Sequence, residues 1–250
     1  MLNYIKAELY RNFNRLYFWG YTGGICIFIL AINIIIKTTS IGNDVNLTVL
    51  FQAATFMLGI PVFLIVAMVD MCIAEEERNV TLKNVVSFGF ERNKLVLSKI
   101  IATIILSIIS AIIILTMFFG SAMILFPIGD KFSTDIIINF TKRLSGSMVL
   151  WIAAISVCSF LAFVIKSNTM FSLIYAMTFL FFKKIVLILS NLVSDKFKYI
   201  YDILITTQLD VLAKEELTNS NLSYAILIGV IYIIVFTILT MVYVKNKEIK

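Results

Sequence analysis

The longest apolar stretch of the chain is Leu95–Phe126, which reads LVLSKIIATIILSIISAIIILTMFFGSAMILF. Its 32 residues would form a helix about 48 Å long at 1.5 Å per residue, whereas about 30 Å suffices to cross the hydrocarbon core of a bilayer. We expect a transmembrane helix that begins outside the hydrocarbon, with Lys99 near the interface. It either bends near Gly120 before Pro127 ends it, or it is one long tilted helix.

The composition of the whole chain agrees with a membrane location. Of its 250 residues, 60% are hydrophobic and 14% charged, and the mean hydropathy is +0.99. Soluble domains are about 45–50% apolar and about 25% charged, so a soluble globule of this size could not cover its apolar surface. This excludes a soluble enzyme and a nucleic-acid-binding domain. Since the strict alternation of barrel strands is absent, we predict an all-α, polytopic membrane protein.

Six apolar runs are long enough to cross the bilayer, and we expect them to form a single permease domain over residues 1–250. The predicted spans are 17–36, 47–73, 95–126, 146–165, 169–188 and 223–244.

The distribution of basic residues predicts which side of the membrane each loop faces. The two termini and the second and fourth connections carry 12 Lys and Arg in about 50 residues, and the other connections carry 9 in about 65. Because short basic loops favour the cytoplasm, we expect both termini to be cytoplasmic.

The N-terminal stretch has the pattern of an amphipathic helix. Leu2, Ile5, Leu9, Phe13 and Leu16 recur at helical spacing. Three cations lie off this stripe and suit an anionic membrane surface: Lys6, Arg11 and Arg15. We predict an interfacial helix along the membrane surface; an ordinary basic flank of the first span is the alternative.

The connection 74–94 combines charges with a short apolar patch. Glu75, Glu76 and Glu77 lie on the basic side, so topology does not explain them. Thr81 can cap a short helix, and Gly89 can end it. This helix would carry Leu82, Val85 and Val86, a patch too short to enter lipid. We expect it to dock on a partner, unless the connection is simply a solvated charged loop.

These residues resemble the ABC-2 type transporter permeases. The resemblance rests on the acidic run, then Thr81-Leu82-Lys83-Asn84, then Gly89, Arg92 and Lys99 ahead of a long span. The layout of the whole chain is similar too, although only about 25 residues carry the motif. One departure is Val80, where many relatives have a small residue.

The resemblance implies a coupling loop that docks on a cytoplasmic ATPase. The implied ATPase-coupling residues are Glu75, Glu76, Glu77, Thr81, Leu82, Lys83, Val85, Val86, Gly89 and Arg92. It also implies two ATPase subunits that bind ATP and Mg, a second permease copy or paralogue, a bacterial plasma membrane, and short re-entrant helices before the last span, for which the apolar segment 190–221 is suited. The chain has no histidine and no Walker A motif, so we expect no catalysis, no metal and no bound cofactor.

The span residues offer few candidates for chemistry. Asp70 is a possible gating partner of Lys99 or Arg92, and Pro61 is a possible kink in the second span. Because charges are almost absent from the span centres, ion-driven transport is disfavoured. The pattern favours ATP-driven export of an amphipathic peptide, antibiotic or lipid-like molecule, as in bacteriocin immunity. The alternatives are a six-span substrate-capture subunit of a vitamin importer and an ATP-independent immunity or scaffold protein.

Overall fold

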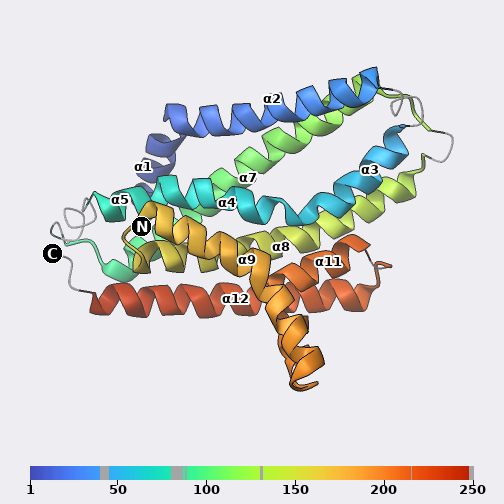
Figure 1. Ribbon diagram of the computed structural model, residues 1–250. Coiled ribbons are helices and arrows are strands. Elements are labelled where there is room, and N and C mark those ends of the chain that lie inside the picture. Colours follow the sequence, from blue (N-terminus) through green and yellow to red (C-terminus); the bar gives the residue numbers. More distant parts are fainter. Residues whose placement is uncertain (40–44, 80–86, 88, 130–131, 215, 248–250) are drawn as a thin grey trace.

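The computed structural model describes residues 1–39, 45–79, 87, 89–129, 132–214 and 216–247, and these residues form helices and no strands (Figure 1). The short α1 (Leu2–Phe13) meets α2 (Leu16–Thr38) at a sharp angle, and α2 packs along α7 (Arg92–Leu125). Then α8 (Thr134–Val164) and α9 (Asn168–Leu192) lead to the short α10 (Phe197–Ile203) and α11 (Ile205–Lys214). The last helix is α12 (Asn219–Asn246).

The second apolar run is a broken helix. It consists of α3 (Leu47–Phe56), a 3-10 turn η2 (Met57–Gly59) and α4 (Pro61–Val69). A π-helical turn η3 (Asp70–Ala74) and the four-residue α5 (Glu75–Arg78) follow without interruption. The two halves, Leu47–Gly59 and Pro61–Arg78, are bent by 53°.

The predicted fold class is confirmed. Five helices are long and apolar enough to cross a membrane, and the bent pair would make a sixth span. The structure decides between the two alternatives for the longest run, and the start of one predicted span differs clearly from the prediction. α7 runs through Gly120 to Leu125 as one helix, so the long helix is the alternative that forms. α8 begins at Thr134, well before residue 146. Its first three turns precede the predicted apolar run and belong to the same helix.

The core of the bundle is built around α8. Two thirds of its most apolar 18-residue stretch is buried, against 11–28% of the corresponding stretch in each of the other four long helices. Small residues allow the neighbouring helices to approach it closely, since Ala153, Ala154 and Cys158 are fully buried. The backbone of α12 comes close to α8 at Gly229, where an added Cβ would lie 2.9 Å from the side chain of Val149 and 3.3 Å from its carbonyl oxygen.

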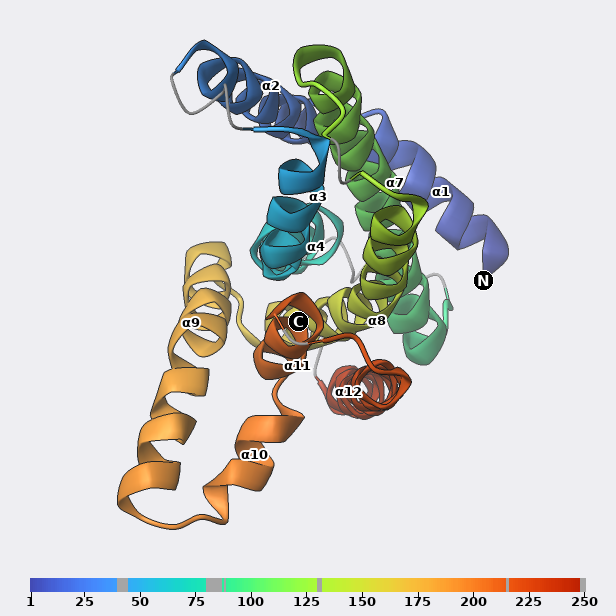
Figure 2. The same cartoon turned by 90° about the vertical axis from the view of Figure 1, so that its right-hand side faces the viewer.

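The helices expected before the last span are present as α10 and α11. The C-terminal part of α9 and α10 form an arm that stands away from the bundle, while α11 folds back onto α8 (Figure 2). α11 is amphipathic, and its Leu209 and Leu212 are buried in the core. The apolar side chains of segment 190–221 are explained in part by α11, which packs inside the protein.

Candidate functional site: an ionic cluster beside a bent span

A buried ionic cluster joins α1, α5 and α7 at one end of the bundle. Lys99 of α7 is fully buried, and its ammonium lies 2.8 Å from a carboxylate oxygen of Glu8 and also pairs with Glu76. Arg11 binds the same two carboxylates, with its guanidinium 2.7 Å from Glu8. Asn12 donates to the Glu8 backbone carbonyl at 3.0 Å. The two cations and two carboxylates balance, as buried charges must.

Two further ion pairs extend this cluster to both sides. Arg15, just before α2, pairs with Glu75, and Lys247, just after α12, pairs with Glu77. The Lys247 ammonium also donates to the carbonyl of Phe163, at 2.8 Å. Each glutamate of the run 75–77 therefore holds a different segment of the chain. This explains why three acids are retained beside so many basic residues.

The end of α12 has a second attachment. The guanidinium of Arg92 donates to the carbonyls of Val244, Lys245 and Lys247, at 3.2, 2.8 and 2.8 Å. The last carbonyls of a helix have no partner within the helix, and they carry the negative end of its dipole. A cation such as Arg92 is therefore favourable at this end of α12. Arg92, expected to flank a partner contact, thus fixes the start of α7 to the end of α12.

The aromatic side chain of Tyr4 closes the cluster on the side of α1. Its ring stacks on Phe90 at 4.8 Å between centroids, and the Lys99 ammonium lies 5.9 Å from its centre. Burial, and then the Glu8 carboxylate, raise the pKa of Tyr4 above its ordinary value. The tyrosine therefore stays neutral and adds no charge to the balanced cluster.

The predicted docking helix itself lies outside the described residues, including Thr81, Leu82, Lys83, Val85 and Val86. Gly89, expected to end that helix, has a φ of 83°, in the left-handed region that favours glycine. It lies three residues before α7 begins.

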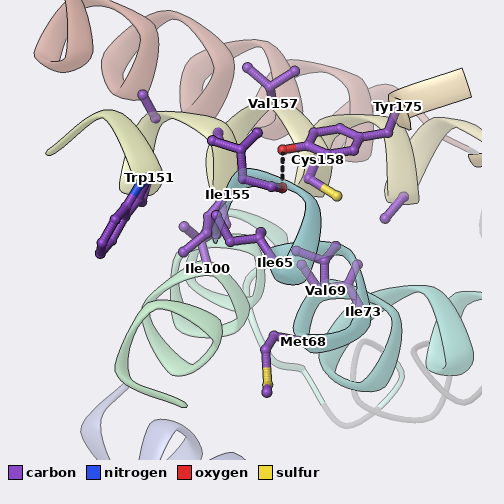
Figure 3. Packing of buried hydrophobic residues seen from close by; sticks show 14 of the residues in the cluster. Ile65, Met68, Val69, Ile73, Ile100, Trp151, Ile155, Val157, Cys158 and Tyr175 are labelled. Atoms are coloured by element: carbon purple, nitrogen blue, oxygen red, sulfur yellow. Dashed lines mark hydrogen bonds between the residues drawn. The ribbon is translucent and has the colours of Figure 1, made fainter. Parts of the chain in front are cut away.

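The bend in the second span is held by three donors from three other helices. Pro61 begins α4 and has no N–H. Around it, Trp151 of α8 donates to the carbonyl of Leu58 at 2.9 Å, and Tyr21 of α2 donates to that of Leu64 at 2.8 Å. Tyr175 of α9 donates to the carbonyl of Val62 at 3.0 Å, which is the dashed line in Figure 3.

These donors explain how an irregular backbone is tolerated between spans. A polar backbone group without a partner is costly in hydrocarbon, so broken helices occur where neighbouring helices supply partners. The kink expected at Pro61 is present, and its stability depends on Tyr21, Trp151 and Tyr175 as well as on the proline.

The remaining predicted residues are placed as follows. Lys99 pairs with Glu8 and Glu76, and Arg92 donates to carbonyls at the end of α12; the pairing of Asp70 with either cation stays a prediction. Asp70 begins the π-helical turn. Of the cations of the interfacial helix, Lys6 is exposed, whereas Arg11 and Arg15 turn toward the protein.

Sequence reasoning missed Glu8, although a signal for it exists. Glu8 is the one acid in the first fifteen residues, and Arg11 lies three positions later, which is the spacing of an ion pair on one helix face. The three donors at the bend also had a signal, because Tyr and Trp within apolar spans need partners for their polar atoms.

The cluster and the bend are connected through continuous structure. A push on α5 would pass through the π-helical turn, whose Cys72 and Ile73 are fully buried, into α4 and the bend at Pro61. Turns of this kind are frequent at functional sites. The described residues hold no group of three or more His, Cys, Asp or Glu able to bind a metal ion. The arrangement is suited to transmitting movement.

The comparison with known families gives one match. The family model described as ABC-2 family transporter protein matches residues 5–183. The matched part begins in α1, contains the ionic cluster except Lys247, and ends within α9. No curated protein matches the chain.

Proposed function

The chain belongs to the ABC-2 family of transporter proteins, and we propose that it is the permease subunit of an ATP-driven exporter. Membership makes it a multi-pass membrane component of a transporter that works with ABC ATPase partners. The proposal goes further in three respects: two ATPases supply ATP and Mg, a second permease copy or paralogue completes the channel, and the cargo is an amphipathic peptide, antibiotic or lipid-like molecule. Both termini would then be cytoplasmic, in the plasma membrane.

The observation that carries the coupling role is the convergence of charged contacts on α5. Glu75, Glu76 and Glu77 attach this short helix to α1, to the residue before α2, to α7 and to the end of α12. An ATPase that moves the connection after α5 would therefore act on several segments at once. In this proposal the glutamates transmit the push inside the permease, while the apolar side chains of 81–86 make the contact with the ATPase.

The cargo class is supported by the position of the charges along the spans. No charged residue lies within 100–125, 144–165 or 219–244. Ion-coupled transporters place titratable groups at such depths, so the energy is better supplied by a partner. A passage with apolar walls and hydroxyl groups suits a cargo with a large apolar surface.

Co-purification tests the coupling role. The wild-type permease, expressed with a candidate partner ABC ATPase, is expected to retain that ATPase through purification. The variant Leu82→Ala/Val85→Ala/Val86→Ala should lose it at least tenfold, because the apolar contact is gone. Leu192→Ala, at an exposed position of α9, is the matched control and should retain it. Equal recovery with all three proteins would contradict the proposed docking segment.

Transport tests the direction and the cargo. Inside-out vesicles with the complex should accumulate an amphipathic peptide or antibiotic in the presence of ATP, and cells that express the complex should become less susceptible to it. ATP-dependent uptake of a small polar vitamin by right-side-out vesicles would instead support the importer alternative.

A further inference from the structure

An apolar cavity of about 110 Å³ lies beside the bend of the second span. Four helices form its wall: α2, α4, α7 and α8. Its lining includes Tyr21, Pro61, Met68, Ser107, Ala111 and Trp151. Trp151, Met68, Ile65 and Ile155, which all face it, are labelled in Figure 3. The cavity therefore contacts the proline of the bend and two of the three residues that donate to its carbonyls.

The wall has almost no capacity to hold water. The hydroxyl of Ser110 is already paired with that of Thr22, at 3.0 Å. The Ser107 hydroxyl is buried and has no hydrogen-bond partner among the residues that the structure describes. An ordered water needs two to four polar partners, whereas an apolar cavity of roughly 150 Å³ stays dry and binds benzene or xenon. The occupant that this cavity favours is apolar.

The position of the cavity indicates where that occupant comes from. On α7 the lining runs from Ser107 to Leu115, about 12 to 24 Å along the helix from Lys99. That depth is close to the middle of a hydrocarbon core about 30 Å thick. At the rim, Leu64, Ile108 and Ile152 are half-buried. Because the medium outside these rim residues is bilayer hydrocarbon, the nearest apolar molecule is a lipid chain.

We propose that the cavity between α2, α4, α7 and α8 is a binding site for a single acyl chain of a bilayer lipid. The chain end fills the space beside Pro61 and packs against Trp151 and Tyr21. Its presence supports the bent form of the second span, since the cavity wall would otherwise face empty space.

Trp151 provides a direct probe of this site, because the chain has only two tryptophans. In the full-length Trp19→Phe protein, Trp151 is the single source of tryptophan fluorescence. The protein is reconstituted in phosphatidylcholine vesicles whose acyl chains carry bromine, a contact quencher, either near the bilayer centre or near the headgroup. We expect strong quenching of Trp151, and stronger quenching from the central bromines.

A cavity-filling variant distinguishes a bound chain from lipid at the outer surface. Ala111→Phe places a ring in the cavity and should reduce the quenching at least twofold. Ile112→Phe is the matched control, since Ile112 is the next residue and 57% exposed, and it should leave the quenching unchanged. Ala111→Leu, a smaller filler, repeats the test if the phenylalanine variant is not monodisperse. Equal quenching in the filled and control proteins, or no quenching in either, would overturn the proposal.

Discussion

The two ends of the helix bundle are stabilised by different contacts. At the end formed by α1, α5 and the last turn of α12, four carboxylates meet four cations, and Lys99 is fully buried among them. At the opposite end, aromatic rings pack against one another: Phe51 stacks on Phe119 at 4.5 Å and meets Phe140 edge to face at 5.6 Å. Away from the ionic end, Lys183 of α9 pairs with Asp210 of α11 at a partly exposed position.

This difference indicates which end can respond to a partner. Aromatic pairs contribute only about 0.5–1.5 kcal/mol each beyond the area that they bury. Charges that are buried together depend on one another, because the loss of one partner leaves the other charge uncompensated. A displacement of α5 therefore disturbs several segments at the ionic end. The opposite end should be stabilised mainly by its packing.

The largest effect is expected from Lys99→Met. This substitution leaves Glu8 and Glu76 with one cation instead of two, and removal of one partner from a buried ion network costs about 3–5 kcal/mol. Denaturation of the purified protein by SDS would measure the loss of stability. Lys99→Met/Glu76→Gln, which restores the balance of charge, should recover more than half of it. A Lys99→Met protein as stable as the wild type would show that the ionic end does not depend on its buried charges.

A smaller effect is expected from the donors at the bend. Tyr175→Phe removes a neutral hydrogen bond to the Val62 carbonyl, and such bonds between membrane helices contribute about 0.6 kcal/mol on average and at most about 1.7. The same SDS titration should show a loss in this range. Tyr199→Phe, on the exposed face of α10, serves as the control and should show none. A loss above about 3 kcal/mol would mean that the bend is as sensitive as the ionic cluster.

The smallest effect is expected from Asp210→Asn, in the partly exposed ion pair between α9 and α11. Asp210 is 49% exposed and Lys183 is 21% exposed, and ion pairs in contact with solvent contribute about 0.2–1 kcal/mol. The Lys183 ammonium also keeps a second contact, 5.5 Å from the centre of the Tyr201 ring. Stability measured in low and high salt should differ little between Asp210→Asn and wild type. A loss comparable with that of Lys99→Met would show that an exposed ion pair stabilises the fold as much as the buried cluster does.

Much of the fold could be predicted because lipid imposes a simple rule on sequence. A run such as Leu95–Phe126 must be helical, since no other structure satisfies its backbone in hydrocarbon. The kink at Pro61 was also predictable, because proline removes an N–H wherever it occurs. The start of α8 was predicted less well, since Thr134–Ser145 mixes apolar residues with Asp135, Lys142 and Arg143, and this mixture interrupts the apolar run.

The ionic cluster could be predicted only in part. The excess of acids at 75–77 on a basic side was visible, and it indicated that these residues have partners. Their partners Arg11, Arg15, Lys99 and Lys247 are between 23 and 170 positions away in sequence, so a local pattern cannot choose among them. The docking role that the sequence suggested for these acids remains a proposal, now centred on the neighbouring segment 81–86.

The sequence by itself determined the membrane location, the helical class, the bend at Pro61 and the amphipathic character of α1. Each of these depends on local composition or on the chemistry of one residue. Only the tertiary structure decided which face of α1 turns inward, which cation pairs with each glutamate and which side chains donate to the carbonyls at the bend. The physical reason is that buried charges and hydrogen bonds act over a few ångströms in space, across segments that are far apart along the chain.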